Sequence, residues 1–304
     1  MKRRLNVTVI GAGLMGHGIA QVFAVAGHRA TVTDTDPNVL DAVPRHIAHN
    51  LALMSMEASP VLDNVRLDGK LAEAVSDADL ILEAAPERAE LKQKLFVEIS
   101  RAAPSTAILA SNTSVIPITE IGVLLDEQAR SRLVGTHWWN PPHLVPLVEV
   151  VKSAYTSDAV FDETFDILAS VGKRPVKVFK DVPGFIGNRL QHALWREAIS
   201  LVDRGVCDAE TIDTVVKQSF GMRLPVLGPM ENADLVGLEL VRNVHRIIFP
   251  DLDCANEPSP LLEGLLAKGH LGMRSGKGLR EWTPESADDV KRLLALHLIA
   301  ARDA

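Results

Sequence analysis

The start of the chain alternates between apolar runs and glycine breaks in a way that predicts regular structure. Residues 5–10 (LNVTVI) form a β-branched run that ends at glycine, residues 15–26 are mainly apolar and are closed by Gly27, and residues 29–33 (RATVT) form a second β-branched run. Short β-branched runs favour strands, and a longer apolar stretch closed by glycine favours a helix. A strand, turn, helix and strand in about 30 residues are typical of a βαβ unit with a parallel sheet.

The same alternation continues as far as residue 182. Amphipathic patterns typical of helices lie at 89–101 and 162–171. Further strands are predicted at 80–83, 106–110, 133–137, 147–151 and 176–179. Strands separated by helices predict an α/β fold with a Rossmann-type doubly wound parallel sheet, which we assign to residues 1–182.

The pattern changes after residue 182, where strand signals cease. Residues 185–204 repeat apolar side chains four positions apart, which is the spacing of a long amphipathic helix. Further helices are expected at 208–220, 231–249, 260–268 and 287–301. We therefore expect an all-α C-terminal domain over residues 183–304.

Composition excludes several classes of function. The 304 residues are 47% hydrophobic with a formal net charge of −7, which gives no global positive field for nucleic acid or an anionic membrane surface. No uncharged apolar run is long enough to predict a membrane span. Only Cys207 and Cys254 are present, which favours a reducing compartment, and we expect a cytoplasmic protein.

A glycine-rich turn follows the first predicted strand. Gly11-Ala-Gly13-Leu14-Met15-Gly16 has the spacing G-x-G-x-x-G, and Asp34 ends the next strand 23 residues after Gly11. Between a strand and a helix, this spacing is typical of a dinucleotide pyrophosphate site at a helix N-terminus. The acid favours NAD over NADP, because it accepts hydrogen bonds from the ribose and repels a 2′-phosphate. The alternative is a turn without a ligand, in which Asp34 only caps.

Polar residues also gather at later strand ends. Ser111-Asn112-Thr113-Ser114 follows one predicted strand, at the carboxyl edge where open α/β sheets bind ligands. His137 ends another strand, and Glu149 lies on the next one. A histidine held by a carboxylate has a fixed tautomer and is suited to take a proton from an alcohol. Spacing alone leaves open a purely structural His–Glu pair.

These motifs together resemble the 3-hydroxyacyl-CoA dehydrogenase family, from Gly11 to about Trp282. The matching segments are 11–16 with Asp34, 83–87 (EAAPE) with Lys92, 111–114 (SNTS), 137–141 (HWWNP), 147–150 (LVEV) and 183–189 (PGFIGNR). The resemblance implies an NAD-dependent oxidoreductase that oxidises a hydroxyl β to a carboxyl group.

The resemblance also implies roles for individual residues. His137 would be the general base and Glu149 would orient it, while Ser114 and Asn188 would bind the substrate oxygen. Asn188 has a helix-capping role as its alternative. The cofactor-binding residues would be Gly11, Gly13, Leu14, Met15, Gly16, Asp34, Glu87, Lys92, Asn112 and Asn140. The resemblance further implies that the helical domain takes part in substrate binding and in dimerisation, since relatives pair through it, so a homodimer is expected.

Two departures concern the substrate. Acyl-CoA members carry a long, Lys-rich helical hairpin after the second strand, whereas residues 36–76 have no basic cluster for coenzyme A phosphates. Residues 221–229 (GMRLPVLGP) look like the lambda-crystallin and L-gulonate 3-dehydrogenase branch, and residues 137–143 are similar to a pyridine-carboxylate dehydrogenase. Both branches act on small free carboxylates. Arg223 is then a candidate carboxylate clamp, with an ordinary surface ion pair as its alternative.

Several interpretations of the substrate and of the function remain open from the sequence. The substrate is a small 3-hydroxy acid or its CoA thioester, the latter as in the 3-hydroxyacyl-CoA and 3-hydroxybutyryl-CoA dehydrogenases of fatty-acid metabolism. A related hydroxy-acid dehydrogenase family uses a lysine on the interdomain helix, where this chain has Arg189 and Arg196. A non-enzymatic, crystallin-like NAD binder is the last alternative. His46 and His49 have no acid or cysteine partner in the pattern, so no metal site is predicted.

Overall fold

The computed structural model describes residues 3–303. Internal contacts divide the chain into two compact units. One, called the sheet unit below, runs to Arg189 and includes the stretch from Leu296 onward. The other, the helical unit, spans Leu190–Ala295.

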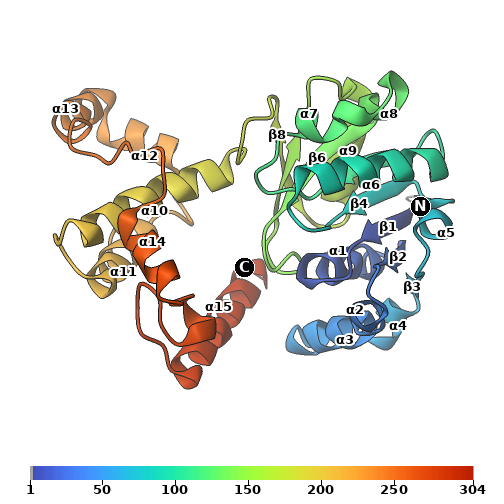
Figure 1. The fold of residues 1–304 in the computed structure, drawn as a ribbon, viewed down its shortest axis with the longest axis horizontal. Coiled ribbons are helices and arrows are strands. Elements are labelled where there is room, and N and C mark those ends of the chain that lie inside the picture. Colours follow the sequence, from blue (N-terminus) through green and yellow to red (C-terminus); the bar gives the residue numbers. More distant parts are fainter. Residues whose placement is uncertain (1–2, 304) are drawn as a thin grey trace. The chain divides into compact units, whose positions relative to one another are not determined.

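The sheet unit is built on one mixed sheet (Figure 1). Its strand order is β3-β2-β1-β4-β5-β6-β7-β8, and all neighbours are parallel except β6 and β7. The strands are β1 (Asn6–Ile10), β2 (Arg29–Thr33), β3 (Val65–Leu67), β4 (Leu80–Glu83), β5 (Ile108–Ser111), β6 (Leu133–Trp138), β7 (Leu147–Val151) and β8 (Arg174–Val178). The order reverses between β1 and β4, which makes the Rossmann-type arrangement that the sequence predicts.

Helices cover both faces of this sheet (Figure 1). One apolar cluster joins the sheet to α1 (Leu14–Val25), α3 (Val43–Leu53) and α9 (Asp158–Ser170). The other joins it to α5 (Leu71–Val75), α6 (Ala89–Ala102), α7 (Ile118–Ile121) and α8 (Glu127–Ser131). The short helices α2 (Pro37–Asp41), α4 (Ser59–Leu62) and η1 (Gly122–Leu124) complete the unit. Central strands buried on both faces explain the nearly continuous apolar runs of β1 and β4.

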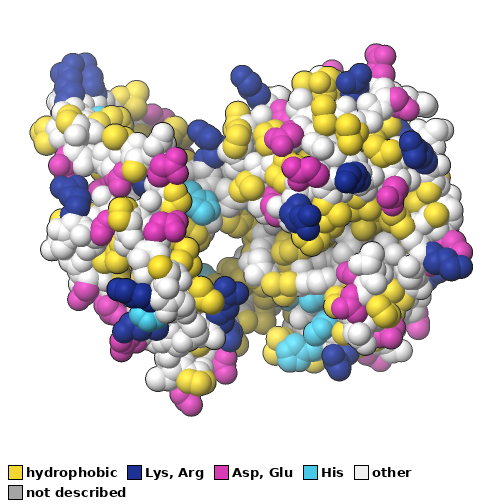
Figure 2. Space-filling view, in the orientation of Figure 1, with side chains coloured by type: hydrophobic (Ala, Val, Ile, Leu, Met, Phe, Trp, Pro, Cys, Tyr) yellow, Lys and Arg dark blue, Asp and Glu magenta, His cyan; other side chains and the backbone are white. Residues whose placement is uncertain are grey.

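The helical unit continues the chain from α10 (Gly187–Asp203) into α15 (Pro284–Asp303), both of which cross a unit boundary. Between them lie α11 (Ala209–Gln218), η2 (Phe220–Met222), α12 (Pro229–Val236), α13 (Leu238–Ile248), α14 (Pro260–Ala267) and η3 (Met273–Ser275). Ala287 is the only buried residue of Leu190–Ala295. Many large apolar side chains are therefore exposed here, interspersed with charged ones (Figure 2). No helix within residues 3–303 is long and apolar enough to span a membrane.

The structure corrects two sequence predictions. The single helix expected over 231–249 is two helices, because Gly237 adopts a positive φ of 91° between α12 and α13. The strand β3 was not predicted, since its three residues, Val65–Leu67, are too few to show a periodic pattern. The strands expected at 106–110 and 176–179 are present with shifted ends, as β5 and β8.

Candidate functional site

The glycine turn between β1 and α1 has the close packing that its spacing predicts. Gly11 has φ +96°, and a Cβ there would lie 2.7 Å from the carbonyl oxygen of Ala84. A Cβ on Gly16 would overlap the carbonyl of Gly11. Side chains are therefore excluded from both positions, which are the ones that form the turn and pack the helix on the strand.

Gly13 differs, because nothing in the protein crowds it. It is the N-cap of α1 without a side-chain cap, and a Cβ at this position would meet no atom within 4 Å. The first turn of α1, in which Leu14 is exposed and Met15 is half-buried, therefore offers uncapped N–H groups and the positive end of a helix dipole. This is a cradle that a dinucleotide pyrophosphate fits.

Asp34 follows β2 and supports the same turn. Its Oδ2 accepts a hydrogen bond from the N–H of Ala12 at 2.7 Å, and its Oδ1 accepts one from the N–H of Asp36 at 2.9 Å. Asp34 thus caps backbone N–H groups, as in the alternative to a role in cofactor binding. A carboxylate nevertheless has further acceptor capacity for a ribose hydroxyl. Residues 35 and 36 are Thr and Asp, so no guanidinium adjoins it to attract a 2′-phosphate.

His137 and Glu149 face each other across β6 and β7. The antiparallel register pairs the two residues directly, and His137 Nδ1 lies 2.7 Å from Glu149 Oε2. The residues are 3% and 1% exposed. Because an ionised carboxylate only accepts hydrogen bonds, His137 carries its proton on Nδ1 and presents the lone pair of Nε2.

The carboxylate of Glu149 is itself held from the far side. Its Oε1 accepts the N–H groups of Ile186 and Gly187 at 2.9 and 3.0 Å, immediately before and within the first turn of α10. Burial is the largest effect and raises the pKa of Glu149, but the hydrogen bonds from His137, Gly187 and Ile186 together bring this pKa below its ordinary value. Glu149 is therefore an anion at neutral pH, and sequence reasoning missed the two backbone donors that keep it so.

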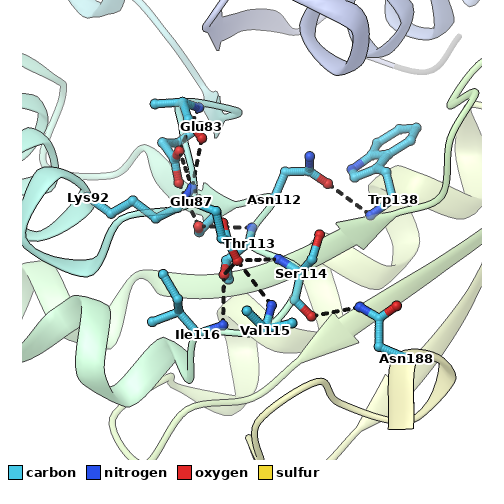
Figure 3. Close-up of polar contacts among 12 residues, drawn as sticks. Glu83, Glu87, Lys92, Asn112, Thr113, Ser114, Val115, Ile116, Trp138 and Asn188 are labelled. Atoms are coloured by element: carbon cyan, nitrogen blue, oxygen red, sulfur yellow. Dashed lines mark hydrogen bonds and ion pairs between the residues drawn. The ribbon is translucent and has the colours of Figure 1, made fainter. Parts of the chain in front are cut away.

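Ser114 lies on the loop that leaves β5, and Glu87 shapes this loop (Figure 3). Glu87 Oε1 accepts hydrogen bonds from Thr113 Oγ1 at 2.5 Å and from the N–H groups of Ser114 and Val115 at 2.8 and 3.0 Å. Asn188 Nδ2 donates to the Ser114 carbonyl oxygen at 2.9 Å. Asn188 lies in the sheet unit and contacts the Ser114 backbone rather than its hydroxyl. The Ser114 hydroxyl oxygen and the Asn188 amide oxygen are therefore both left for a ligand.

Lys92 joins Glu87 to a second carboxylate, that of Glu83 (Figure 3). Lys92 Nζ lies 2.6 Å from Glu83 Oε1, 3.1 Å from the Ala85 carbonyl and 3.4 Å from Glu87 Oε2. Ser111 Oγ donates to Glu83 Oε2 at 2.6 Å. Lys92 is 1% exposed, so these protein oxygens and not water surround its ammonium. Its predicted role in cofactor binding would therefore be an indirect one, through Glu87.

Glu83 is the site residue to which sequence reasoning gave no role. It ends β4, whose other residues are apolar, and it is fully buried. A carboxylate at the end of an otherwise apolar buried strand was the available signal, because buried charges are paired. The partners lie 9 and 28 residues away and could not be identified from spacing.

The other predicted residues of this edge of the sheet are Asn112 and Asn140. Asn112 Oδ1 accepts the N–H of Trp138 at 3.0 Å, and Asn140 is exposed just beyond β6 (Figure 3 shows the first contact). The Trp139 ring lies 5.2 Å from that of His137, whereas Trp138 belongs to the apolar core.

Arg223 belongs to the helical unit, whereas the site residues described above belong to the sheet unit. Its side chain is exposed and has no hydrogen-bond or ion-pair partner in residues 3–303. The surface ion pair named as its alternative is thus not formed. The described residues also hold no cluster of three metal-ligating side chains.

Two family models match the chain. The NAD-binding domain of 3-hydroxyacyl-CoA dehydrogenase matches residues 6–182, and the C-terminal domain of the same enzyme matches residues 184–282. The chain belongs to the 3-hydroxyacyl-CoA dehydrogenase family. It is an NAD-dependent dehydrogenase, as the glycine turn and the His–Glu pair indicate.

Individual members of the family differ in their substrates. The chain is 34% identical over 303 residues to 5-formyl-3-hydroxy-2-methylpyridine 4-carboxylate 5-dehydrogenase of Mesorhizobium japonicum, covering 98% of this chain and 97% of that one. It is 38% identical over 292 residues to a probable 3-hydroxyacyl-CoA dehydrogenase of Caenorhabditis elegans, covering 91% and 92%. A solved structure of the pyridine-carboxylate enzyme, described as an NAD+ dependent dismutase, superposes with a TM-score of 0.90 at 32% identity and covers 99% and 98% of the two chains.

Proposed function

We propose that this dehydrogenase oxidises the hydroxyl of a small free carboxylic acid rather than that of a CoA thioester. The reaction removes a hydride from the carbinol carbon and a proton from its oxygen. NAD, when bound, accepts the hydride. The protein supplies the base, the contacts to the substrate oxygen and a donor for the carboxylate.

His137 is the base in this proposal. Its Nε2 receives the alcohol proton while Nδ1 stays bonded to Glu149, and the imidazolium that forms is stabilised by the adjacent anion. The three hydrogen bonds to Glu149 fix the carboxylate, and thereby the ring. This arrangement has the features of an acid–base pair in which a third group orients the base.

Ser114 and Asn188 bind the reacting oxygen. Glu87 holds the Ser114 backbone through one N–H, and Asn188 holds it through the carbonyl. The backbone of Ser114 and the side chain of Asn188 are therefore held together before substrate binds, which supports this role because preorganised donors stabilise charge better than mobile ones.

The preference for a free acid rests chiefly on the segment between β2 and β4. Residues 36–76 contain three basic and six acidic residues, and two of the bases are already paired. Arg66 contacts Asp68 at 2.8 Å and Lys70 contacts Glu73 at 2.7 Å, which leaves Arg45. Coenzyme A carries several phosphate charges, which such a segment repels rather than attracts. The family's Lys-rich hairpin has no counterpart here.

Arg223 is the proposed partner of the substrate carboxylate. An exposed guanidinium without a protein partner keeps all its donors for a ligand, and its planar fork matches a carboxylate in a bidentate contact. The similarity to a pyridine-carboxylate dehydrogenase supports this choice of substrate class.

We further propose that the protein is a cytoplasmic homodimer. The helical unit has one buried residue, and its exposed apolar side chains include Trp195 on α10 and Ile247 on α13. A cavity of about 510 Å³ lies beside α10 and α11, with a mainly apolar lining. An apolar surface of this kind needs a partner, and a second copy presents the matching surface by symmetry. Light scattering should give twice the chain mass, and Ile247→Asp should lower it.

The test of the proposed reaction is a substrate panel. NADH formation is measured with L-gulonate, carnitine, 3-hydroxybutyrate and hydroxymethyl-pyridine carboxylates, and with 3-hydroxybutyryl-CoA in parallel. We expect at least one free acid to have the highest kcat/KM. A higher kcat/KM for the thioester than for every free acid would contradict the proposal and favour an enzyme of fatty-acid metabolism.

A further inference from the structure

The loop between β6 and β7 connects the two strands that carry His137 and Glu149. Within it, the carbonyl oxygen of Pro141 accepts the N–H groups of Leu144 and Val145, each at 3.0 Å. The two successive prolines have no N–H to donate. The other buried carbonyls of this loop therefore need donors from elsewhere in the protein.

Lys173 provides such a donor. It immediately precedes β8, and its Nζ donates to the carbonyl oxygens of Pro142 and Val145, the second at 2.9 Å. The same ammonium lies 5.3 Å from the ring centroid of Trp138. One buried side chain thus joins two points of the loop to the end of β6.

The position of this ammonium is costly for the fold. Lys173 is 8% exposed and no carboxylate of the described chain pairs with it, and burial lowers the pKa of its amine to about 8. A residue kept under these conditions is expected to do more than fill space, since an apolar side chain would pack at lower cost.

The opposite side of the loop rests on α1. A Cβ on Gly18 would lie 2.6 Å from Cγ of Pro142, so only glycine allows the loop to lie this close. Gly18 is two residues beyond Gly16, the last glycine of the dinucleotide turn. The loop is therefore held between Lys173 and the helix whose N-terminus forms the cofactor cradle.

We propose that Lys173 is a positioning residue, which holds the 140–146 loop against α1 and so fixes Asn140, one of the predicted cofactor-binding residues, at the end of β6. The inference rests on the proposed NAD-dependent reaction and on the predicted contact of Asn140 with the cofactor. Asn140 lies two residues before Pro142, which Lys173 holds, and it has no hydrogen bond of its own among the described residues. Releasing the tether therefore moves Asn140 while leaving the glycine turn and Asp34 unchanged.

The first experiment removes the donor. Lys173→Met keeps the length of the side chain and its contact with Trp138, and Lys177→Met is the matched control. Lys177 lies on the same part of the chain but forms an exposed ion pair with Asp162 at 2.6 Å. Since a shift of about 1 Å can lower rates by about 10²-fold, Lys173→Met should lower kcat by about 10- to 100-fold. The dissociation constant for NAD should change by less than about threefold, because the pyrophosphate contacts are intact.

A second readout needs no substrate. The fluorescence of bound NADH reports the surroundings of the nicotinamide, and Lys173→Met should change it relative to wild type and Lys177→Met. Lys173→Arg, which restores the donors, should recover part of the wild-type value. A merely structural lysine would lower the unfolding temperature without altering kcat or NADH fluorescence below that temperature. That result would overturn the proposal.

A second variant tests the loop from its other side, and it applies if Lys173→Met does not fold. Gly18→Ala adds a methyl group against Pro142 within a helix that alanine itself favours. It should reproduce the loss of kcat, whereas Gly264→Ala, in a helix where a Cβ meets nothing within 4 Å, should not. Wild-type kcat and NADH fluorescence in Gly18→Ala would contradict the proposal. An active His137→Gln enzyme would instead contradict the proposed base and leave the loop tether standing.

Discussion

The buried Lys92 side chain gives the sharpest prediction of stability. Lys92→Met removes the ammonium that lies 2.6 Å from Glu83 Oε1 and 3.4 Å from Glu87 Oε2. Glu83 is 0% exposed, so water cannot replace the lost partner. Removing one member of a buried ion pair costs about 3–5 kcal/mol, because the other charge is left unpaired.

This free energy corresponds to a large thermal shift. For a unit of this size, 1 kcal/mol shifts the midpoint by about 2–4 °C, so Lys92→Met should unfold about 6–20 °C earlier. The double variant Glu83→Gln/Lys92→Met removes the unpaired charge at Glu83, and it should be more stable than Lys92→Met alone.

Urea and thermal unfolding, followed by circular dichroism with NAD absent, measure these differences. Lys70→Met is the matched control, because its pair with Glu73 has a similar 2.7 Å separation but side chains that are 75% and 58% exposed. Such exposed pairs contribute about 0–1 kcal/mol. The reasoning is refuted if Lys92→Met costs no more than Lys70→Met, or if the double variant is as unstable as the sum of its single changes.

Three further predictions concern cofactor, substrate and pH. Asp34→Ser should lower the preference for NAD over NADP by at least about tenfold, as judged from the two kcat/KM values, since it removes the charge that repels a 2′-phosphate; an unchanged ratio would limit Asp34 to its contacts with backbone. Arg223→Met should raise KM for the acid substrate by about 10- to 100-fold and change kcat much less, and an unchanged KM would exclude the clamp. The pKa of Glu149 is lowered in the fold, so its contribution to stability is present above its unfolded pKa of about 4.3 and is lost as pH falls through the folded pKa. Glu149→Gln should therefore make the free energy of unfolding fall less steeply with decreasing pH, and an equally steep fall would contradict this.

Local patterns were sufficient to predict the first turn and every strand of the sheet except β3. The glycine spacing at 11–16 and the apolar runs of β1 and β4 each encode a local geometry, because a tight turn needs glycine and a buried strand needs apolar side chains on both faces. The break at Gly237 was missed because the apolar pattern continues through it, although one residue with a positive φ ends the helix.

The site was predictable only where two residues lie on paired strands. His137 and Glu149 are opposite each other because β6 and β7 run antiparallel. The sequence pattern placed the two residues on successive strands, but it predicted a parallel sheet and not this reversal of direction. The contacts of Glu83 with Ser111, and those of Lys173 with Pro142, join elements far apart in sequence. Such contacts are set by the packing of the whole sheet and not by any local propensity, so the sequence shows the charged residue but not its partner.

The measurement that tests the account most directly is the turnover of His137→Gln. Glutamine retains hydrogen-bonding capacity toward Glu149 but cannot act as a base at neutral pH. With a substrate from the panel, kcat should fall by about 10²- to 10⁴-fold, while the dissociation constant for NAD measured by calorimetry stays near the wild-type value. A variant that binds NAD normally and turns over at the wild-type rate would show that the proton leaves the alcohol by another route, and His137 would lose its assigned role.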